Sequence, residues 1–215
     1  MTFSIVARDP QTGAFGVATA TAGPMVGALV PHIKAGLGAA ATQAMTNPYL
    51  AIDALDRLGE MDAEKALHLA LARDEAAARR QIVVIDRLGQ VAAWTGEQCS
   101  AFAGHLSEPD VAVAGNLLAG PEVLSEMLGA YRPALEKSGF AAALLAALDA
   151  GAAAGGDSRG LGSAALRVQA DQAFPDIDIR VDRSGAPLAA LAELLAEAST
   201  GPYADFFAEV PRRNR

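Results

Sequence analysis

A threonine directly after the initiator methionine carries two reactive groups in one residue. Met1 is removed when a small residue follows it, so we expect a mature chain that begins with Thr2. A terminal threonine holds a hydroxyl nucleophile and a free α-amine, whose reference pKa of about 7.7–8.0 leaves part of it neutral near pH 7. The amine can take the hydroxyl proton, directly or through one water, and later return it to a leaving amine. Thr2 is therefore the candidate nucleophile, although Met-Thr starts are common in proteins without this chemistry.

Metal and thiol chemistry have no local support in the sequence. No two histidines form an HxxxH or HExxH pair, and the single Cys99 has no second cysteine near it. The chain therefore lacks a local zinc signature, and a lone cysteine is more often a small buried hydrophobe than a nucleophile. We expect no metal and no cofactor. The three histidines are His32, His68 and His105.

Two glycine-rich segments imitate a dinucleotide-binding fingerprint. Residues 36–41 and 160–165 both read GxGxxA. A nucleotide site requires a strand, a tight turn and then a helix N-terminus, whereas each of these segments leads into a predicted strand. The sequence also contains no GxSxG elbow and no GxxxxGK[ST] loop. We therefore reject both segments as nucleotide sites.

The composition is that of an acidic globular protein. The 215 residues carry a net charge of −8, and 52% of them are hydrophobic. These values exclude a cationic nucleic-acid binder and an intrinsically disordered chain. The start of the chain has no basic segment typical of a signal peptide, and apolar runs such as 140–148 are too short to span a bilayer. We expect a soluble, cytoplasmic single domain over 1–215, with a peripheral tail at 203–215.

Short strands in pairs alternate with pairs of helices along the chain. This order predicts an α+β fold and disfavours a doubly wound parallel sheet. Asn47 and Asp62 are candidate N-caps of the first two helices, and Gly59 is the candidate stop of the first. The strands are expected at 2–7, 15–21, 26–33, 37–43, 81–86, 90–95, 101–105, 111–114, 163–169 and 177–181, and the later helices at 121–131, 139–150 and 187–198.

The opening TFSIVARDP resembles that of an uncharacterised bacterial and archaeal domain-of-unknown-function family, regarded as part of the N-terminal-nucleophile (Ntn) hydrolase superfamily. The resemblance implies a four-layer αββα sandwich of two stacked antiparallel sheets. It also implies amide cleavage through an acyl-enzyme at the N-terminal residue, here Thr2. The resembling segments, which extend over nearly the whole domain, are 2–10, 12–13, 16–18, 30–31, 35–39, 41–43, 46–48, 95–96, 99, 103–105, 115–116, 119–123, 154–160, 163–165 and 180–182.

The resemblance makes three polar residues at predicted strand ends candidates for the active site. Asn116 follows a strand and can donate its side-chain N–H to an oxyanion, or it can be a turn residue that tolerates positive φ beside Gly115. Thr42 and Gln43 end a strand that borders the nucleophile, where they can line a substrate pocket. They can equally be an ordinary polar strand end.

The glycine-rich loop at 154–160 supplies the remaining candidates. Glycines allow the backbone to approach a ligand closely, and Arg159 can hold a substrate carboxylate with two parallel hydrogen bonds. Asp157 can instead tie the loop down, and Ser163 begins the strand that follows. Lys34 can lower the pKa of the nucleophile, as a lysine does in proteasome-type relatives, but a solvated surface lysine fits better.

The leading hypothesis is an amidohydrolase that acts on a small amide or peptide-like substrate through a Thr2 acyl-enzyme. Its rival is a non-catalytic module of the same fold that binds a small molecule or a cell-wall fragment. A third is a structural partner in a larger assembly, since Ala-rich helix faces favour a homo-oligomer such as a dimer. Residues 19–25, TATAGPM, lack the bulkier groups of many relatives, which predicts a roomier or less polar pocket. We expect no nucleic-acid or membrane partner.

Overall fold

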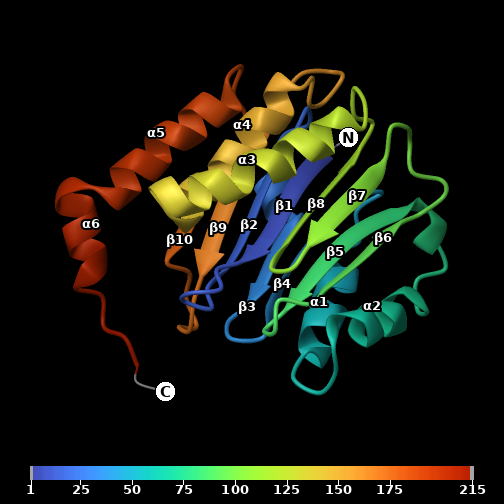
Figure 1. Ribbon diagram of the computed structural model, residues 1–215, viewed down its shortest axis with the longest axis horizontal. Coiled ribbons are helices and arrows are strands. Elements are labelled where there is room, and N and C mark those ends of the chain that lie inside the picture. The colour runs from blue at the N-terminus through green and yellow to red at the C-terminus, as the bar shows by residue number, and fades with distance from the viewer. Residues whose placement is uncertain (1, 214–215) are drawn as a thin grey trace.

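The computed structural model describes residues 2–213. Ten strands in this part of the chain form two antiparallel sheets, one of six strands in the order β10-β9-β2-β1-β8-β7 and one of four in the order β3-β4-β5-β6. The sheets are stacked face to face (Figure 1). The strands are β1 (Thr2–Arg8), β2 (Phe15–Thr21), β3 (Pro31–Lys34), β4 (Gly38–Ala44), β5 (Arg80–Asp86), β6 (Val91–Thr95), β7 (Gly104–Glu108), β8 (Val111–Asn116), β9 (Ser163–Gln169) and β10 (Ile177–Val181).

Helices cover the outer face of each sheet (Figure 1). Helices α3, α4 and α5 pack on the six-stranded sheet, and α1 and α2 pack on the four-stranded sheet. The expected mixed α+β fold with two stacked antiparallel sheets is thus confirmed. The helices within residues 2–213 are α1 (Pro48–Arg57), α2 (Ala63–Leu71), α3 (Glu122–Ser138), α4 (Phe140–Ala153), α5 (Pro187–Ser199) and α6 (Gly201–Ala208).

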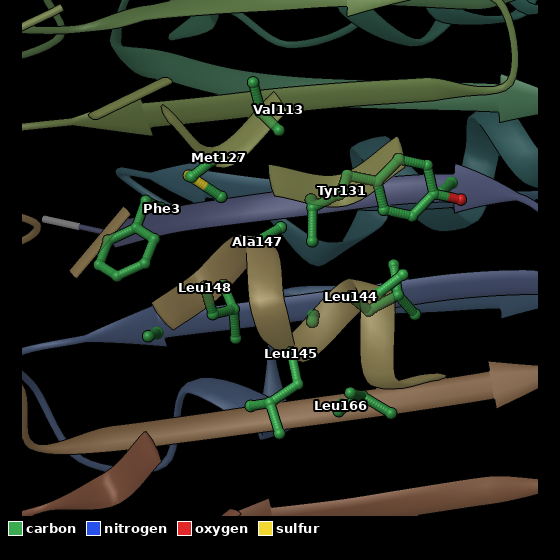
Figure 2. Packing of buried hydrophobic residues seen from close by; sticks show 14 of the residues in the cluster. Phe3, Val113, Met127, Tyr131, Leu144, Leu145, Ala147, Leu148 and Leu166 are labelled. Carbon is green, nitrogen blue, oxygen red and sulfur yellow. The ribbon is translucent and has the colours of Figure 1, made fainter. Parts of the chain in front are cut away.

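The core beneath α3 and α4 follows from strand alternation. In β1, Phe3 and Ile5 point toward the helices, because successive strand side chains face opposite sides of the sheet. Figure 2 shows Phe3 packed near Met127 of α3 and Leu148 of α4. A Cβ added to Gly16 of β2 would lie 2.4 Å from Leu144 Cδ1 and 2.9 Å from the Phe140 ring, so a larger residue there would displace these α4 side chains.

The helix starts match their sequence signals. The Asn47 side chain accepts a hydrogen bond from the Tyr49 N–H, and the Asp62 side chain accepts one from the Lys65 N–H. Each cap satisfies a backbone donor that the first helical turn leaves unpaired. Pro48 occupies the first turn of α1, where its missing N–H costs no hydrogen bond.

Three segments differ from the sequence expectation. The strand expected over 26–33 is a 3-10 turn, Val26–Ala28, followed by a four-residue strand, because Met25 adopts a left-handed backbone with φ of 61°. Helix α3 continues through Pro133 to Ser138. The strand expected at 101–105 lies at Gly104–Glu108, as β7. Helix α6 occupies part of the tail expected at 203–215, and none of its residues is buried.

Over the described residues 2–213, none of the helices is both long and apolar enough to cross a membrane.

Candidate active site

The layer between the two sheets is apolar at one end and polar at the other. Its apolar part includes Val6, Val17 and Ile85. At the other end, β1 and β9 begin while β2 and β8 finish, and the side chains that point inward there are hydroxyls and amides. We call this group the polar cluster; it comprises Thr2, Ser4, Thr19, Thr21, Gln43, Gln81, Thr95, Asn116 and Ser163.

Thr2 lies at the centre of the six-stranded sheet, in register with Thr21 on one side and Asn116 on the other. It is 8% exposed, and its Oγ1 donates to Thr21 Oγ1 at 3.3 Å. Ser163 continues the same row, because it pairs with Thr21. The structure therefore brings three of the sequence-predicted residues, Thr2, Asn116 and Ser163, to one end of the sheet.

Three buried amide side chains join the two sheets next to Thr2. Gln43 Nε2 donates to the Thr2 carbonyl oxygen at 3.3 Å and to Gln81 Oε1 at 2.8 Å. Asn116 Nδ2 donates to the same Gln81 oxygen at 3.0 Å. Each of the three residues is at most 2% exposed. Because their bonds are shared, these amides hold one another in fixed orientations.

Gln81 anchors this arrangement from the four-stranded sheet. Its Nε2 lies 2.9 Å from Thr95 Oγ1, 2.9 Å from the Gly104 carbonyl and 2.8 Å from the Gly115 carbonyl. An amide nitrogen has two hydrogens, so it can serve two of these three acceptors at a time. Gln81 thereby ties β5 to β6, β7 and β8 at the polar cluster.

Ser4 extends the cluster along β1. Its hydroxyl lies 2.5 Å from Gln43 Oε1 and 2.8 Å from Thr19 Oγ1. Thr19 in turn donates to the Phe3 carbonyl at 3.3 Å. The side chains that face the four-stranded sheet are therefore hydrogen-bonded at this end, which satisfies polar groups that would otherwise be costly to bury.

Two residues with left-handed backbone follow the amides directly. Ala44, after Gln43, has φ of 68°, and Leu117, after Asn116, has φ of 53°. Non-glycine residues in this region carry backbone strain, and such strain concentrates at functional sites. Asn116 itself belongs to strand β8, so it is not the positive-φ turn residue that the sequence left open. Its buried side chain serves the polar cluster instead.

Thr42 lies outside the cluster. Gln43 points between the sheets, so its neighbour Thr42 points to the opposite face, toward the helices. There its Oγ1 donates to the Asn47 carbonyl at 3.1 Å, at the start of α1. The structure therefore does not bring Thr42 together with Thr2. Lys34 is also distant: it pairs with Gly38 at the other end of β4, and its Nζ binds Asp56 at 2.6 Å.

The glycine-rich loop at 154–160, which contains Asp157, crosses the end of the six-stranded sheet at which Thr2 lies. Asp157 Oδ2 accepts from the Ala22 N–H at 2.7 Å, just after β2, and Asp157 forms a β-bridge with Leu118, just after β8. Because β1 lies between β2 and β8, the loop spans the two neighbours of the strand that begins at Thr2. The Asp157 carboxylate is buried and holds this loop in place.

Arg159 belongs to the same loop, and Ser163 begins β9 just after it. Arg159 is exposed, and its Nε and Nη2 each lie 3.3 Å from the Asp157 carboxylate. Ser163 Oγ donates to the Gly23 carbonyl at 2.7 Å and accepts from the Val26 N–H at 3.2 Å. Ser163 therefore anchors the segment after β2, while the guanidinium of Arg159 stays accessible to solvent.

Thiol and metal chemistry find no support near this cluster. Burial raises the pKa of the Cys99 thiol, whose Sγ donates to the Arg80 carbonyl at 3.3 Å. A protonated thiol is a weak nucleophile. Among residues 2–213, no group of three or more histidine, cysteine, aspartate or glutamate side chains is arranged to hold a metal ion. Thr2 lines none of five surface clefts of about 200 to 680 Å³ on this part of the chain.

Comparison with known proteins places the chain in a family. A model described as a family of unknown function, DUF1028, matches residues 2–191. The crystal structure of protein SPO2555 from Silicibacter pomeroyi, assigned to the same family model, superposes with a TM-score of 0.91 at 35% identity, over 98% of this chain and 91% of that one. The chain belongs to the DUF1028 family. No curated protein matches the sequence of this DUF1028 member.

A second solved structure matches weakly. Anbu (ancestral beta-subunit) from Yersinia bercovieri aligns over 99% of this DUF1028 chain and all of its own, with a TM-score of 0.38 and 11% identity. A score this low supports no inference about the chain.

Sequence reasoning missed several members of the polar cluster in this DUF1028 protein. The strongest omission is Gln81, the residue that joins the amides. A usable signal was present: Gln81 is a polar residue in the strand QIVVID, on the face that Val83 and Ile85 share. Ser4 and Thr19 carry the same signal, since each is a hydroxyl at an inward position of an otherwise apolar strand.

Proposed function

We propose that the protein is an Ntn-type amidohydrolase that cleaves a small amide or peptide-like substrate through an acyl-enzyme on Thr2. The observation that carries the proposal is the position of the Thr2 hydroxyl, at the first described residue of a central strand and beside the polar cluster. The helix layers outside two stacked sheets, together with the sequence resemblance, support an Ntn-type αββα fold.

The proposed base is the α-amine of Thr2 itself. Within residues 2–213, the hydrogen-bond partner of Thr2 Oγ1 is the Thr21 hydroxyl, which is not a base at neutral pH. A free amine on the same residue supplies the missing proton acceptor. The proposal therefore requires removal of Met1, whose placement lies outside the described residues.

The reaction divides into acylation and hydrolysis. Thr2 Oγ1 attacks the substrate carbonyl carbon, and its proton passes to the α-amine. The tetrahedral intermediate collapses, the carbon–nitrogen bond breaks, and the α-ammonium returns the proton to the leaving amine. Water then attacks the Thr2 ester and releases the acid, which restores the hydroxyl. No cofactor takes part in this sequence.

Asn116 is the proposed oxyanion donor. One of its two N–H groups is used by Gln81 Oε1, and the second, which has no other partner within residues 2–213, can donate to the negative oxygen of the intermediate. The shared bonds among Gln43, Gln81 and Asn116 keep this donor oriented before substrate arrives. Donors that are oriented in advance contribute about 3–4 kcal/mol each to stabilisation of the transition state.

Arg159 is the proposed contact for a substrate carboxylate. It is an exposed residue of the loop that crosses the Thr2 end of the sheet, and its side-chain contacts with Asp157 are long, at 3.3 Å. A carboxylate can therefore compete for the guanidinium, which binds such groups with two parallel hydrogen bonds. Asp157 keeps the loop in place, and Ser163 holds the neighbouring segment.

Three variants test the proposal against a panel of acylated anilides. Thr2→Ala should abolish turnover, and Thr2→Ser should retain a measurable fraction because the hydroxyl and the amine remain. An alanine inserted between Met1 and Thr2 should also abolish turnover, since it moves the amine away from the hydroxyl. Unfolding temperatures close to that of the wild type serve as the control. Unchanged turnover by a folded Thr2→Ala protein would reject the mechanism.

A non-catalytic binding module is the second proposal. The observations that favour this alternative are the low exposure of Thr2 and its absence from the five clefts described above. It predicts that a chain with the inserted alanine binds the same small molecules as the wild type, without turnover. Turnover that depends on a free Thr2 would exclude it.

Self-association remains a further proposal. Helix α6 has no buried residue, yet Tyr203, Phe206 and Phe207 form an aromatic cluster on it, with ring centroids 5.5 to 6.1 Å apart. A short helix of this kind is marginal in water without packing partners. We expect a homo-oligomer, and light scattering after chromatography should give a smaller mass for Phe206→Ser than for the wild type. A monomeric wild type would contradict this expectation.

A further inference from the structure

A cleft at the opposite end of the inter-sheet layer from Thr2 contains several basic side chains. It has a volume of about 560 Å³ and lies where the ends of β3 and β9 meet the C-terminal segment. Ser163 begins β9 at the Thr2 end, and Gln169 finishes β9 at the cleft. The two sites are thus separated by the length of a seven-residue strand.

The cleft arises from the unequal width of the two sheets. β3 is the edge strand of the smaller sheet and packs against β2 and β9, while the larger sheet continues beyond β9 to β10. The inward side chain of β9 near this edge is Arg167, which pairs across to Asp178 of β10. The part of the larger sheet that extends past β3 is therefore polar, whereas the centre of the layer between the sheets is apolar.

Arg167 has unused hydrogen-bonding capacity. Its Nε is buried and has no hydrogen-bond partner among the described residues; the Asp178 carboxylate is 3.6 Å away. Its Nη2 makes a long contact of 3.5 Å with Gln169 Oε1. A buried, unsatisfied N–H of a charged group is costly, and an oxyanion in the cleft would relieve that cost.

The C-terminal segment provides a second guanidinium. Arg213 is held by its backbone: its N–H donates to Gln172 Oε1 at 2.9 Å, and its carbonyl accepts from Gln172 Nε2 at 3.1 Å. Gln172 is 6% exposed, so this attachment is a buried one. Arg213 lines the cleft together with Arg167. Within residues 2–213 no ion pair forms between Arg213 and a carboxylate, whereas the neighbouring Arg212 binds Asp176.

The other charged residues in the lining of the cleft are Lys34 and Asp171. Lys34 lines the cleft and binds Asp56 at 2.6 Å, but its side chain is 43% exposed and can turn toward a ligand. Asp171 is the acidic residue in the lining, so the lining carries a formal charge of 3 − 1 = +2 in a chain of net −8. Asp56 and Asp178 offset part of that charge from outside it.

We propose that this cleft binds a small oxyanion, a carboxylate or a phosphate, between Arg167 and Arg213. The site is separate from the proposed hydrolase site. The C-terminal segment forms one of its walls, and this wall lies beyond residue 191, where the family match ends. Bound anion would attach that segment more firmly to the sheet edge.

Calorimetric titration with inorganic phosphate and, separately, with succinate tests the proposal at constant ionic strength. We expect saturable binding of at least one of the two, and the pair distinguishes a phosphate ligand from a carboxylate. Arg167→Met and Arg213→Ala should each weaken it about tenfold or more, the effect of losing one charge-assisted hydrogen bond. Arg73→Ala, which removes an exposed charge elsewhere, should leave affinity unchanged.

The controls keep this test independent of the hydrolase. Thr2→Ala should bind the anion as the wild type does, because Thr2 lies at the other end of the layer. Arg213→Ala alters the C-terminal segment outside the core, so it remains informative if Arg167→Met does not fold. The proposal is overturned if neither anion binds saturably, or if the Arg213→Ala and Arg73→Ala variants bind with the same affinity.

Discussion

Replacement of Gln81 by methionine should destabilise the protein more than the same replacement of a glutamine at an exposed position. Gln81 accepts hydrogen bonds from Gln43 and Asn116 and, with two hydrogens for three acceptors, donates two at a time. Four bonds at about 1 kcal/mol each are worth about 4 kcal/mol. Burial of the more apolar methionine returns about 1 kcal/mol, so we expect a net loss of about 3 kcal/mol. Domains of this kind have a total stability of about 5–15 kcal/mol.

Urea unfolding followed by circular dichroism measures this loss. For a chain of this size, about 3 kcal/mol corresponds to a fall in unfolding temperature of about 6–12 °C. The matched control is Gln98→Met at an exposed position, which should change stability by less than about 0.5 kcal/mol. A double-mutant cycle with Asn116→Ala should give a coupling above about 0.5 kcal/mol. A loss for Gln81→Met no larger than that of Gln98→Met would refute the account of the polar cluster.

Two further predictions concern titratable groups, namely the buried Tyr131 hydroxyl and two histidines that the fold desolvates only in part. The Tyr131 hydroxyl is buried without a hydrogen-bond partner among the described residues, so Tyr131→Phe should leave the free energy of unfolding unchanged or raise it by about 1 kcal/mol; a loss above about 1 kcal/mol in urea unfolding would contradict this. Burial lowers the pKa of His32 and His105 below 6.5, so the unfolded chain binds more protons as the pH falls through that value. Stability should therefore decrease between pH 7 and pH 5, less steeply in a His32→Gln/His105→Gln variant, and a decrease of equal slope in both proteins would count against the assignment.

Local signals and periodicity predicted most of the helices and strands and the α+β class, whereas the stacking of two sheets was expected only from the family resemblance. Alternation in β1 and β2 predicted the first hairpin, and the Asn47 and Asp62 caps mark the true starts of α1 and α2. The strand expected over 26–33 failed because the left-handed conformation of Met25 depends on contacts far along the chain. One such contact is the bond from the Met25 N–H to the Asp182 carbonyl.

The candidate site was accessible only in part. Thr2, Asn116 and Ser163 share one sheet, so their common end follows from strand order once the resemblance is noted. The amide link from Gln43 to Gln81 and onward to Asn116 crosses between sheets, and neither local spacing nor periodicity reports which faces stack. Thr42 was expected to line the pocket beside Thr2 but faces the helices, because a change of one position along a strand moves a side chain to the opposite face.

The most direct test of the account is the mass and N-terminal sequence of the purified protein, before and after treatment with a β-lactone. A lactone opens on a nucleophilic hydroxyl, so the mass of the protein increases by that of the whole reagent. The account predicts a chain that begins at Thr2 and carries one adduct on Thr2, with no adduct in the Thr2→Ala variant. A chain that retains Met1 and takes up no reagent would contradict the hydrolase proposal and leave the binding module in its place.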